Sequence, residues 1–311
     1  MRYVVKPFIV VRWQAALAVC AIFATSARAE EARMLRWKFA KGETKRYVQE
    51  QEMVSEQTSK GRSMKTTVKQ TMDVTWRIKS VDEEGLAEIT QTVDRVRMKV
   101  QRPPEAGPSL AFDSDEKSGA SPETREMAAH FQALLKHPIA MKIDAQGAVS
   151  DVEIPDSIKE ALEGPEPGSG GEEAFKETFT TNTIQFPAEP VKRGSSWKHA
   201  TESKTPFGKQ KATTTYTYDG IENHEGQHLD KIDLKLALEV NEDDEAKARP
   251  KIVSQKSEGV IYFDGEHGWL AMLHSTSKVQ TELTQGVMKL GETISTTTRI
   301  KLAQPAGADE K

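Results

Sequence analysis

Two histidines and a glutamate occur in the order that zinc peptidases use: His224, Glu225 and His228 match the pattern H-E-x-x-H. On a helix, residues i and i+4 share a face, so two such imidazoles can bind one Zn²⁺ while the glutamate polarises a metal-bound water. Here Gly226 lies inside the string, and strict alternation of apolar residues begins at Ile232, which indicates strands on both sides. The context therefore favours a solvated hairpin tip without a metal, and a zinc metallopeptidase is kept as an alternative.

A second string, Ser275 to Lys278, matches the S-x-x-K pattern of acyl-serine enzymes. That chemistry needs serine and lysine one helical turn apart, whereas in the strand expected here the two side chains point to opposite faces. The sequence contains no G-x-S-x-G string, no phosphate-binding glycine loop and no dinucleotide fingerprint. We therefore expect a protein that is not an enzyme, with no catalytic residues and no cofactor.

The first 29 residues have the organisation of a secretory signal peptide. Residues 1–14 carry three basic residues and no acid, residues 15–24 are apolar, and Ala27 and Ala29 supply the small residues that a signal peptidase requires. We expect cleavage before Glu30 and export to the periplasm or the cell exterior. The apolar run is short for a membrane span, so we expect no integral span after its removal.

Cys20 offers an alternative to soluble export, because a lipoprotein is cut before a cysteine that is then acylated. Val19 stands where such a site normally has a small residue, which favours cleavage after Ala29. Cys20 is the only cysteine of the chain. A mature chain starting at Glu30 would therefore have no disulfide, no thiolate metal ligand and no cysteine nucleophile.

The charge balance excludes one class of partner. The formal net charge is −4, and loss of the four basic residues of the signal peptide would change it to −8. Lysines alternate with acids along the chain rather than gathering into a basic patch, so we expect no nucleic-acid binding. Charged residues make up 29% of the sequence and aromatic ones 6%. Sheets with one solvated face have this composition.

Residues 64–79 predict a long antiparallel strand with one apolar and one polar face. Side chains alternate across a pleated strand with period two, and the apolar residues all occupy even positions: Met64, Val68, Met72, Val74, Trp76 and Ile78. The partner strand is expected over residues 86–100, after a hairpin at Gly85. Its apolar residues change parity halfway, which predicts a bulge near Asp94 and Arg95.

The remaining elements follow from turn signals and periodicity. Residues 102–122, rich in proline, glycine and serine, predict a loop, and residues 123–136 predict a helix. A hairpin is expected over residues 139–154. We divide the chain into a β-rich first half (30–154), a helical and flexible connector (155–186), a β-rich second half (187–303) and a disordered tail (304–311).

The second half repeats features of the first. The turn around Gly194 stands where the turn around Gly42 stood, and the hairpin at residues 264–268 resembles the hairpin at residues 144–147. We predict a mainly β fold of the α+β type. In it, long antiparallel meander sheets form a degenerate tandem repeat of curved half-barrels or sandwiches, with a few short helices between the halves.

Several segments together resemble an uncharacterised family of secreted bacterial proteins that carry a domain of unknown function. The resemblance spans nearly all of residues 34–303 and is carried by four strings: Leu35-Arg36-Trp37-Lys38-Phe39 with Lys41-Gly42-Glu43, Thr71-Met72-Asp73-Val74-Thr75-Trp76, Thr90-Gln91-Thr92-Val93-Asp94-Arg95-Val96-Arg97-Met98, and Pro190-Val191-Lys192 with Gly194, Ser196 and Trp197. It implies a scaffold and supplies no catalytic residues. The expected architecture is also similar in outline to periplasmic lipoprotein carriers of the LolA/LolB type.

These observations support three hypotheses of function. The first is an exported, non-catalytic envelope protein that binds an apolar or amphiphilic ligand, such as a lipid or another envelope component, in a β half-barrel. The second is a structural or interaction module without a ligand pocket. The third is a zinc metallopeptidase that uses His224, Glu225 and His228.

Overall fold

The computed structural model describes residues 32–59, 61–116, 122–162, 171–205, 208–242, 249–285 and 288–303. The expected signal peptide, its cleavage residues Ala27, Ala29 and Glu30, the residue Cys20 and the expected tail 304–311 lie outside the described residues. The same is true of most of the flexible part of the connector, residues 163–170.

Strands dominate the described residues, as the sequence predicts. The strands are β1 (Thr44–Ser59), β2 (Arg62–Val81), β3 (Ala87–Gln101), β4 (Leu110–Asp113), β5 (Ile139–Ile143), β6 (Val149–Glu153), β7 (Ser196–Thr205), β8 (Gly208–His224), β9 (Gln227–Glu242), β10 (Arg249–Asp264), β11 (Trp269–Gln285) and β12 (Met288–Leu302). The helices are α1 (Pro122–Gln132), α2 (Asp156–Leu162) and α3 (Gly171–Asn182), with a 3₁₀ turn at Pro104–Ala106.

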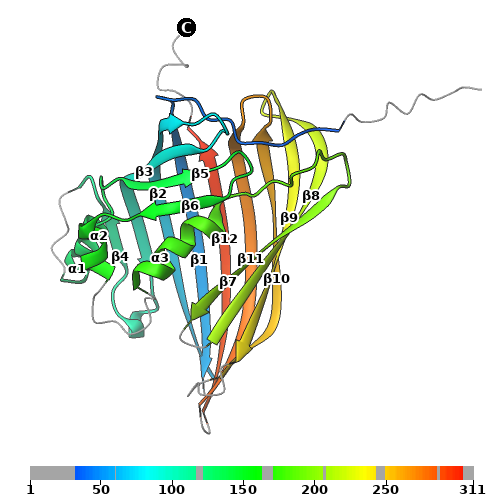
Figure 1. The fold of residues 1–311 in the computed structure, drawn as a ribbon. Helices are drawn as coiled ribbons and strands as arrows, with labels where there is room; N and C mark the ends of the chain where they lie inside the picture. The colour runs from blue at the N-terminus through cyan, green and yellow to red at the C-terminus, as the bar shows by residue number, and fades with distance from the viewer. Residues whose placement is uncertain are drawn as a thin grey trace, which may run out of the picture. The chain divides into compact units, whose positions relative to one another are not determined.

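All twelve strands belong to one open antiparallel sheet (Figure 1). Its order is β6-β5-β3-β2-β1-β12-β11-β10-β9-β8-β7. The short strand β4 pairs with the C-terminal part of β3. The last strand of the second half pairs with the first strand of the first half, Tyr47 lying opposite Leu302. The two β-rich halves expected from the sequence are therefore continuous with each other through the β1–β12 pair.

The alternation at residues 64–79 forms the central part of β2. Its even-numbered face includes Val74 and Ile78, which are buried, and its odd-numbered face carries lysines and threonines. The predicted bulge in β3 is confirmed, because Asp73 pairs with Arg95 and Val74 with Val93, which leaves Asp94 as the extra residue. Such a bulge moves Val96 onto the same face as Val93.

The tandem repeat is visible in matching backbone hydrogen bonds. The amide of Gly42 donates to the carbonyl of Ile78, and that of Gly194 donates to the carbonyl of Tyr218. Both glycines have φ of 85°, a value that favours glycine strongly. The two halves therefore enter their meanders through the same tight turn.

The hairpin turns of the two halves also share one device. Asp144 Oδ1 accepts hydrogen bonds from the amides of Gln146 and Ala148, and Asp264 Oδ1 accepts them from Glu266 and His267. Aspartate side chains that bond the backbone ahead of them stabilise turns locally. Each aspartate thus fixes the turn that follows β5 or β10.

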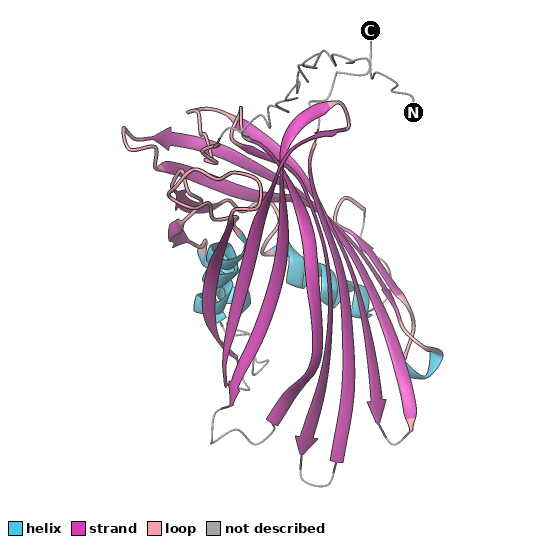
Figure 2. Ribbon diagram, turned by 90° about the vertical axis from the view of Figure 1, so that its right-hand side faces the viewer, coloured by secondary structure: helices cyan, strands magenta, loops and turns pink. Residues whose placement is uncertain are grey.

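Helix α3 lies between the two edges of the sheet. It contacts β6 and β7, which are the terminal strands of the sheet order. Figures 1 and 2 show the helices on one side of the long strands. The expected connector is therefore the element that joins the two edges, and the sheet curves around the side on which the helices pack.

An aromatic cluster around Trp37 fills one end of the curved sheet. The ring of Trp37 lies between 5.5 and 6.3 Å from five other rings, those of Phe39, Trp76, Phe186, Phe263 and Trp269. Its indole N–H donates to the carbonyl of Ile184 at 3.0 Å. Buried residues from strands of both halves surround this cluster, among them Ile89, Ile232 and Ile261. Trp37, Trp76 and Trp269 thus serve as core anchors.

The interpretation of residues 102–122 as a loop was incomplete, because they contain β4. Leu110 and Phe112 of this short strand are buried. Phe112 stacks on Phe131 of α1 at 5.7 Å, and both rings pack with Val96 in a second, smaller core cluster. A four-residue strand between prolines and glycines is too short to produce a recognisable period, which explains the omission.

Candidate functional site

The H-E-x-x-H string lies at a hairpin tip, as its context predicts. β8 ends at His224 and β9 begins at Gln227, so Glu225 and Gly226 form a two-residue turn. Both turn residues have positive φ, 49° and 84°, as type I′ hairpins require. His224 pairs with Gln227 and Asn223 pairs with His228, so the two imidazoles belong to opposite faces of the hairpin. This arrangement does not bring the histidines together.

Two members of the string make contacts that stabilise the fold. The imidazole of His224 stacks on Tyr262 of β10, with ring centroids 4.0 Å apart. Glu225 accepts a hydrogen bond from Lys301 of β12 at 2.7 Å, and this contact lowers the pKa of the carboxyl. The hairpin tip is thereby held to strands further along the sheet. Among the described residues, no group of three His, Cys, Asp or Glu side chains could hold a metal ion.

The S-x-x-K string also lies within a strand. Ser275 is opposite Gly259 and Thr298 in the sheet, whereas Lys278 is opposite Lys256 and Ser295. Because Ser275 and Lys278 are three residues apart in β11, their side chains point to opposite faces. This placement does not bring the two groups together.

The sheet has one face that is nearly free of charge, which we call the inner face. It is the face that carries Tyr47, Trp76, Tyr216 and Ile261, and the strand registers extend it across the sheet because paired residues share a face. Beyond the aromatic cluster it presents apolar residues and neutral Ser, Thr and Gln. The charged exceptions among the described residues are Lys45 and Asp230 at the packed end, which pair with Glu43 and Arg33, and Glu292, whose carboxylate accepts hydrogen bonds from Ser55 and Gln57.

The opposite, outer face is densely charged. Cross-strand ion pairs run along it, with N···O distances of 2.6 to 3.6 Å: Arg97–Asp73, Lys69–Glu52, Lys65–Glu56 and Arg299–Glu50. Exposed pairs of this kind contribute little to stability. They do keep a long sheet soluble on this face, and they account for much of the charged composition of the chain.

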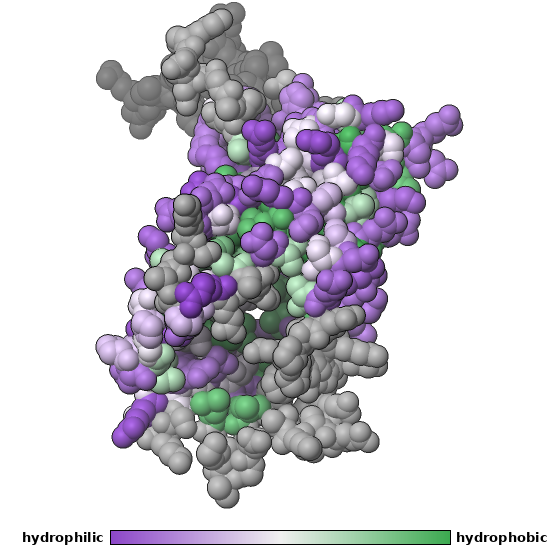
Figure 3. Space-filling view, turned by 90° about the vertical axis from the view of Figure 1, so that its left-hand side faces the viewer, coloured by the Kyte–Doolittle hydropathy of each residue, from purple (hydrophilic) through white to green (hydrophobic). Residues whose placement is uncertain are grey.

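The inner face is covered unevenly. At its packed end, side chains of the edge strands β5 and β6 and of α3 join the aromatic cluster around Trp37 in the main core cluster. At its open end, seven apolar side chains are only half buried and belong to neither core cluster. The open end is defined by these residues: Met53, Val68, Leu236, Leu238, Ile252, Val279 and Ile294. Figure 3 shows one side of the molecule, on which hydrophobic side chains lie recessed among hydrophilic ones.

Neutral polar groups lie between the apolar residues and the packed end. The hydroxyls of Ser257 and Ser277 hydrogen-bond to each other at 2.6 Å. On β7, partial burial lowers the pKa of His199, which favours the neutral imidazole. A face of this type combines apolar contact with uncharged hydrogen-bonding groups, which is the usual composition of small-molecule sites.

Strands β9 and β10 separate towards the open end. Their backbones pair from Asp230–Phe263 to Lys235–Glu258. Further along, the side chain of Gln255 of β10 bonds to the backbone of Leu238 of β9. Its amide oxygen accepts from the Leu238 N–H at 2.9 Å, and its amide nitrogen donates to the Leu238 carbonyl at 3.2 Å. The two strands are thus joined there by one side chain instead of a backbone ladder.

Sequence reasoning identified the strands but not the open end. Alternation shows that a strand has two faces, and it does not show what covers the apolar one. The signal that could have located the open end is a change of composition along each strand: aromatic residues at one end give way to Ser, Thr, Gln and aliphatic residues at the other, as in β8 from Tyr218 to Ala212.

None of the described helices has the length and hydropathy that crossing a membrane requires.

Comparisons with known proteins give a family without an activity. The model of a family of unknown function, DUF6263, matches residues 84–270. No curated protein matches the sequence. Among solved structures, a lipovitellin, reported for its lipid–protein interactions, has a TM-score of 0.48 and 14% identity. The alignment covers 88% of this chain and 26% of the lipovitellin chain, so this chain spans about a quarter of that protein.

Proposed function

Because the chain belongs to the family of unknown function DUF6263, which supplies no activity, we propose from the geometry of the inner face that the protein binds an apolar or amphiphilic molecule without converting it. The observation that carries this proposal is the open end, where seven apolar side chains are half buried outside both core clusters. Apolar surface left in water costs about 25 cal/mol per Å². A ligand that covers these side chains would recover that free energy.

The chemistry of the face suits a lipid-like ligand. Its aliphatic residues can contact hydrocarbon, and its Ser, Thr and Gln side chains can bond a neutral polar group such as an ester or hydroxyl. Its shortage of charge avoids the cost of desolvating an unpaired ion. The junction at Gln255 and Leu238 offers a place where β9 and β10 can part to admit a ligand, because only side-chain hydrogen bonds need to break there.

We further infer that the protein acts in the bacterial envelope or outside the cell. The supporting observation is the signal-peptide pattern of residues 1–29, with Ala27 and Ala29 before Glu30. Sequencing of the mature N-terminus tests this inference. A start at Glu30 is the expected result, and a start at an acylated Cys20 or an intact Met1 would contradict soluble export.

Binding to the open end can be tested with a neutral apolar dye, N-phenyl-1-naphthylamine, whose fluorescence increases in apolar surroundings. The variant Ile294→Lys places a charge on the inner face, and we expect its dye affinity to fall at least tenfold because the ammonium must be desolvated. Thr293→Lys is the matched control. Thr293 is the neighbouring outer-face residue, opposite Glu56, so this variant should bind dye like the wild type.

The result separates the proposal from a structural module without a pocket. Dye binding by the wild type that is lost in Ile294→Lys and kept in Thr293→Lys supports a ligand site. Equal binding by all three proteins, or no binding by the wild type, would contradict it.

A further inference from the structure

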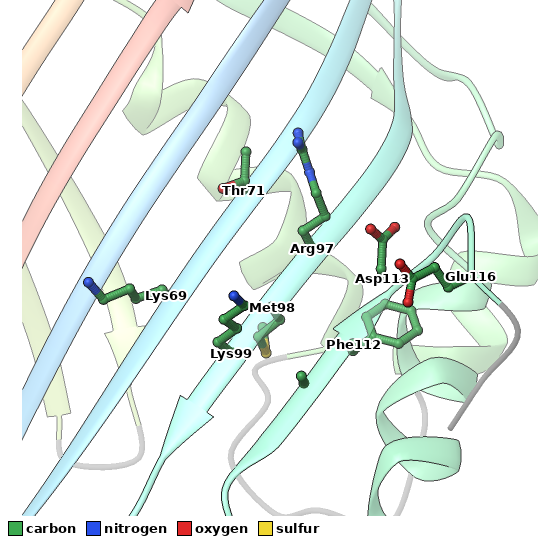
Figure 4. A pocket seen from close by; sticks show the side chains of 9 residues that line it. Lys69, Thr71, Arg97, Met98, Lys99, Phe112, Asp113 and Glu116 are labelled. Atoms are coloured by element: carbon green, nitrogen blue, oxygen red, sulfur yellow. The ribbon is translucent and has the colours of Figure 1, made fainter. Parts of the chain in front are cut away.

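A separate hollow of about 520 Å³ lies over β2, β3 and β4, and most of its lining residues belong to the outer face of the sheet. The argument concerns six of its lining residues: Lys69, Thr71, Arg97, Lys99, Asp113 and Glu116. Figure 4 shows the first four on the two neighbouring strands β2 and β3, with Asp113 and Glu116 towards the other side, along β4 and the turn after it. The hollow therefore has a cationic wall and an acidic wall.

The cationic wall contains two lysines directly opposite each other. Lys69 of β2 pairs in register with Lys99 of β3. Like charges in this position are destabilising. Lys69 has a partial counter-charge in Glu52, 3.2 Å away. Lys99 has no ion pair with any residue that the structure describes, so a positive charge at the hollow is left without a partner.

Arg97 adds a hydrogen-bond donor to the same wall. Its Nη2 pairs with Asp73 at 2.6 Å, whereas its Nε is shielded from solvent and has no hydrogen-bond partner among the described residues. A shielded donor without an acceptor costs free energy comparable to a lost hydrogen bond. A small rotation of the guanidinium towards the hollow would bring this donor within reach of an acceptor there.

The acidic wall offsets the cationic one only in part, because Asp113, although it is directly opposite Arg97 in the register, has its carboxylate bonded to another residue. Asp113 is held by Arg95 through two hydrogen bonds of 2.6 and 2.9 Å, and this contact lowers the pKa of the carboxyl. The negative charge of Asp113 on β4 is therefore balanced by Arg95 on β3. Glu116 is exposed and lies at the far side of the hollow from Lys69 (Figure 4).

We propose that this hollow binds an oxyanion of the phosphate class. Lys69 and Lys99 supply the charge, the guanidinium of Arg97, which lines the hollow, supplies further donors, and the hydroxyl of Thr71, which is opposite Arg97 in the register, supplies another. Phosphate has several acceptor oxygens and suits a mixture of lysine charges and directed donors. The anion is either free phosphate or the phosphate of a phospholipid headgroup, and the site is independent of any ligand on the inner face.

A second lysine pair in the sheet provides a matched control. Lys256 of β10 is directly opposite Lys278 of β11, and Lys256 pairs with Glu258 at 2.8 Å. Lys278, like Lys99, is the member of its pair without an ion pair in the described part of the chain. Neither Lys256 nor Lys278 lines the hollow. Lys278→Gln therefore removes the same repulsion as Lys99→Gln without touching the proposed site.

Isothermal titration calorimetry with inorganic phosphate, against chloride at equal ionic strength, tests the site in the full mature chain. We expect Lys99→Gln to weaken phosphate binding about tenfold or more, since it removes a charge-assisted hydrogen bond, and Lys278→Gln to leave it unchanged. Thermal unfolding of both variants should occur at or slightly above the wild-type midpoint, because each loses a like-charge contact. That readout shows that Lys99→Gln is folded.

Cosedimentation with vesicles distinguishes the two sources of the anion. Vesicles of phosphatidylglycerol in phosphatidylcholine that retain the wild type, but not Lys99→Gln, would identify a headgroup. Binding of inorganic phosphate without vesicle retention would identify a free anion. Either outcome supports the site. Wild-type protein that binds neither probe, or a Lys99→Gln variant that binds phosphate as tightly as wild type, would overturn it.

Discussion

At the packed end of the inner face, Trp37 is surrounded by five aromatic rings, whereas at the open end Val279 and Ile294 lie outside both core clusters. Both ends belong to the same strands and follow the same alternation. What differs is coverage, because the segment around Trp37 and α3 pack at one end, together with side chains of the edge strands β5 and β6. The comparison teaches that this chain concentrates its core in a fraction of its apolar surface and leaves other apolar side chains outside the core clusters.

Among the substitutions considered, we expect the largest loss of stability at the packed end. Trp37→Ala removes a buried indole and leaves the carbonyl of Ile184 without its donor. Loss of a buried tryptophan costs about 3–5 kcal/mol of the free energy of unfolding, and denaturant titration followed by circular dichroism measures this loss. A loss below about 1 kcal/mol would show that the aromatic cluster does not hold the two halves together.

A pair of identical substitutions compares a packed site with the open end. Val96 is 0% exposed beside Phe112 and Phe131, and Val279 is half buried at the open end. We expect Val96→Thr to cost about 1–3 kcal/mol because it buries a hydroxyl. Val279→Thr should cost less than about 0.5 kcal/mol, the usual range for surface substitutions.

Denaturant titration of both threonine variants provides the measurement. Equal losses in the two variants would contradict the distinction between covered and uncovered parts of the inner face. Addition of the neutral dye should stabilise wild type more than Val279→Thr if the open end is the binding site.

The smallest effect concerns an exposed contact at the hairpin tip. Lys301 lowers the pKa of Glu225, so the ionised carboxyl favours the folded state. This contribution is present above the unfolded pKa of about 4.3 and is lost as the pH falls through the lowered folded pKa. Glu225→Gln should therefore be slightly less stable than wild type at pH 7, and the difference should shrink as the pH falls below about 4. Thermal unfolding over this pH range measures it, and a difference that does not change with pH would assign the effect to something other than the charge.

Much of the fold could be predicted from the sequence, because it depends on local patterns. Strict alternation located β2 and β9, a change of parity placed the bulge at Asp94, and repeated turn residues identified Gly42 and Gly194 as equivalent. These signals arise from neighbouring residues. They require no knowledge of which strands meet.

The features that could not be predicted depend on residues far apart in the chain. The pairing of β1 with β12 joins segments separated by more than two hundred residues. The helix α3 is near β6 and β7 in the chain, but its contacts with both depend on where these strands lie in the sheet, at its opposite edges. The hollow beside Lys99 needs β4, whose four residues carry no period. The open end consists of apolar side chains that no core cluster includes. A local sequence pattern does not indicate which apolar side chains other elements will cover.

The central claim is that the open end of the inner face holds an apolar or amphiphilic molecule. Native mass spectrometry of the protein purified from the envelope fraction of its own cells tests it most directly, with Ile294→Lys as the comparison. The account predicts that wild-type protein carries an added mass of lipid size that Ile294→Lys lacks. A wild-type mass equal to that of the bare mature chain would contradict it.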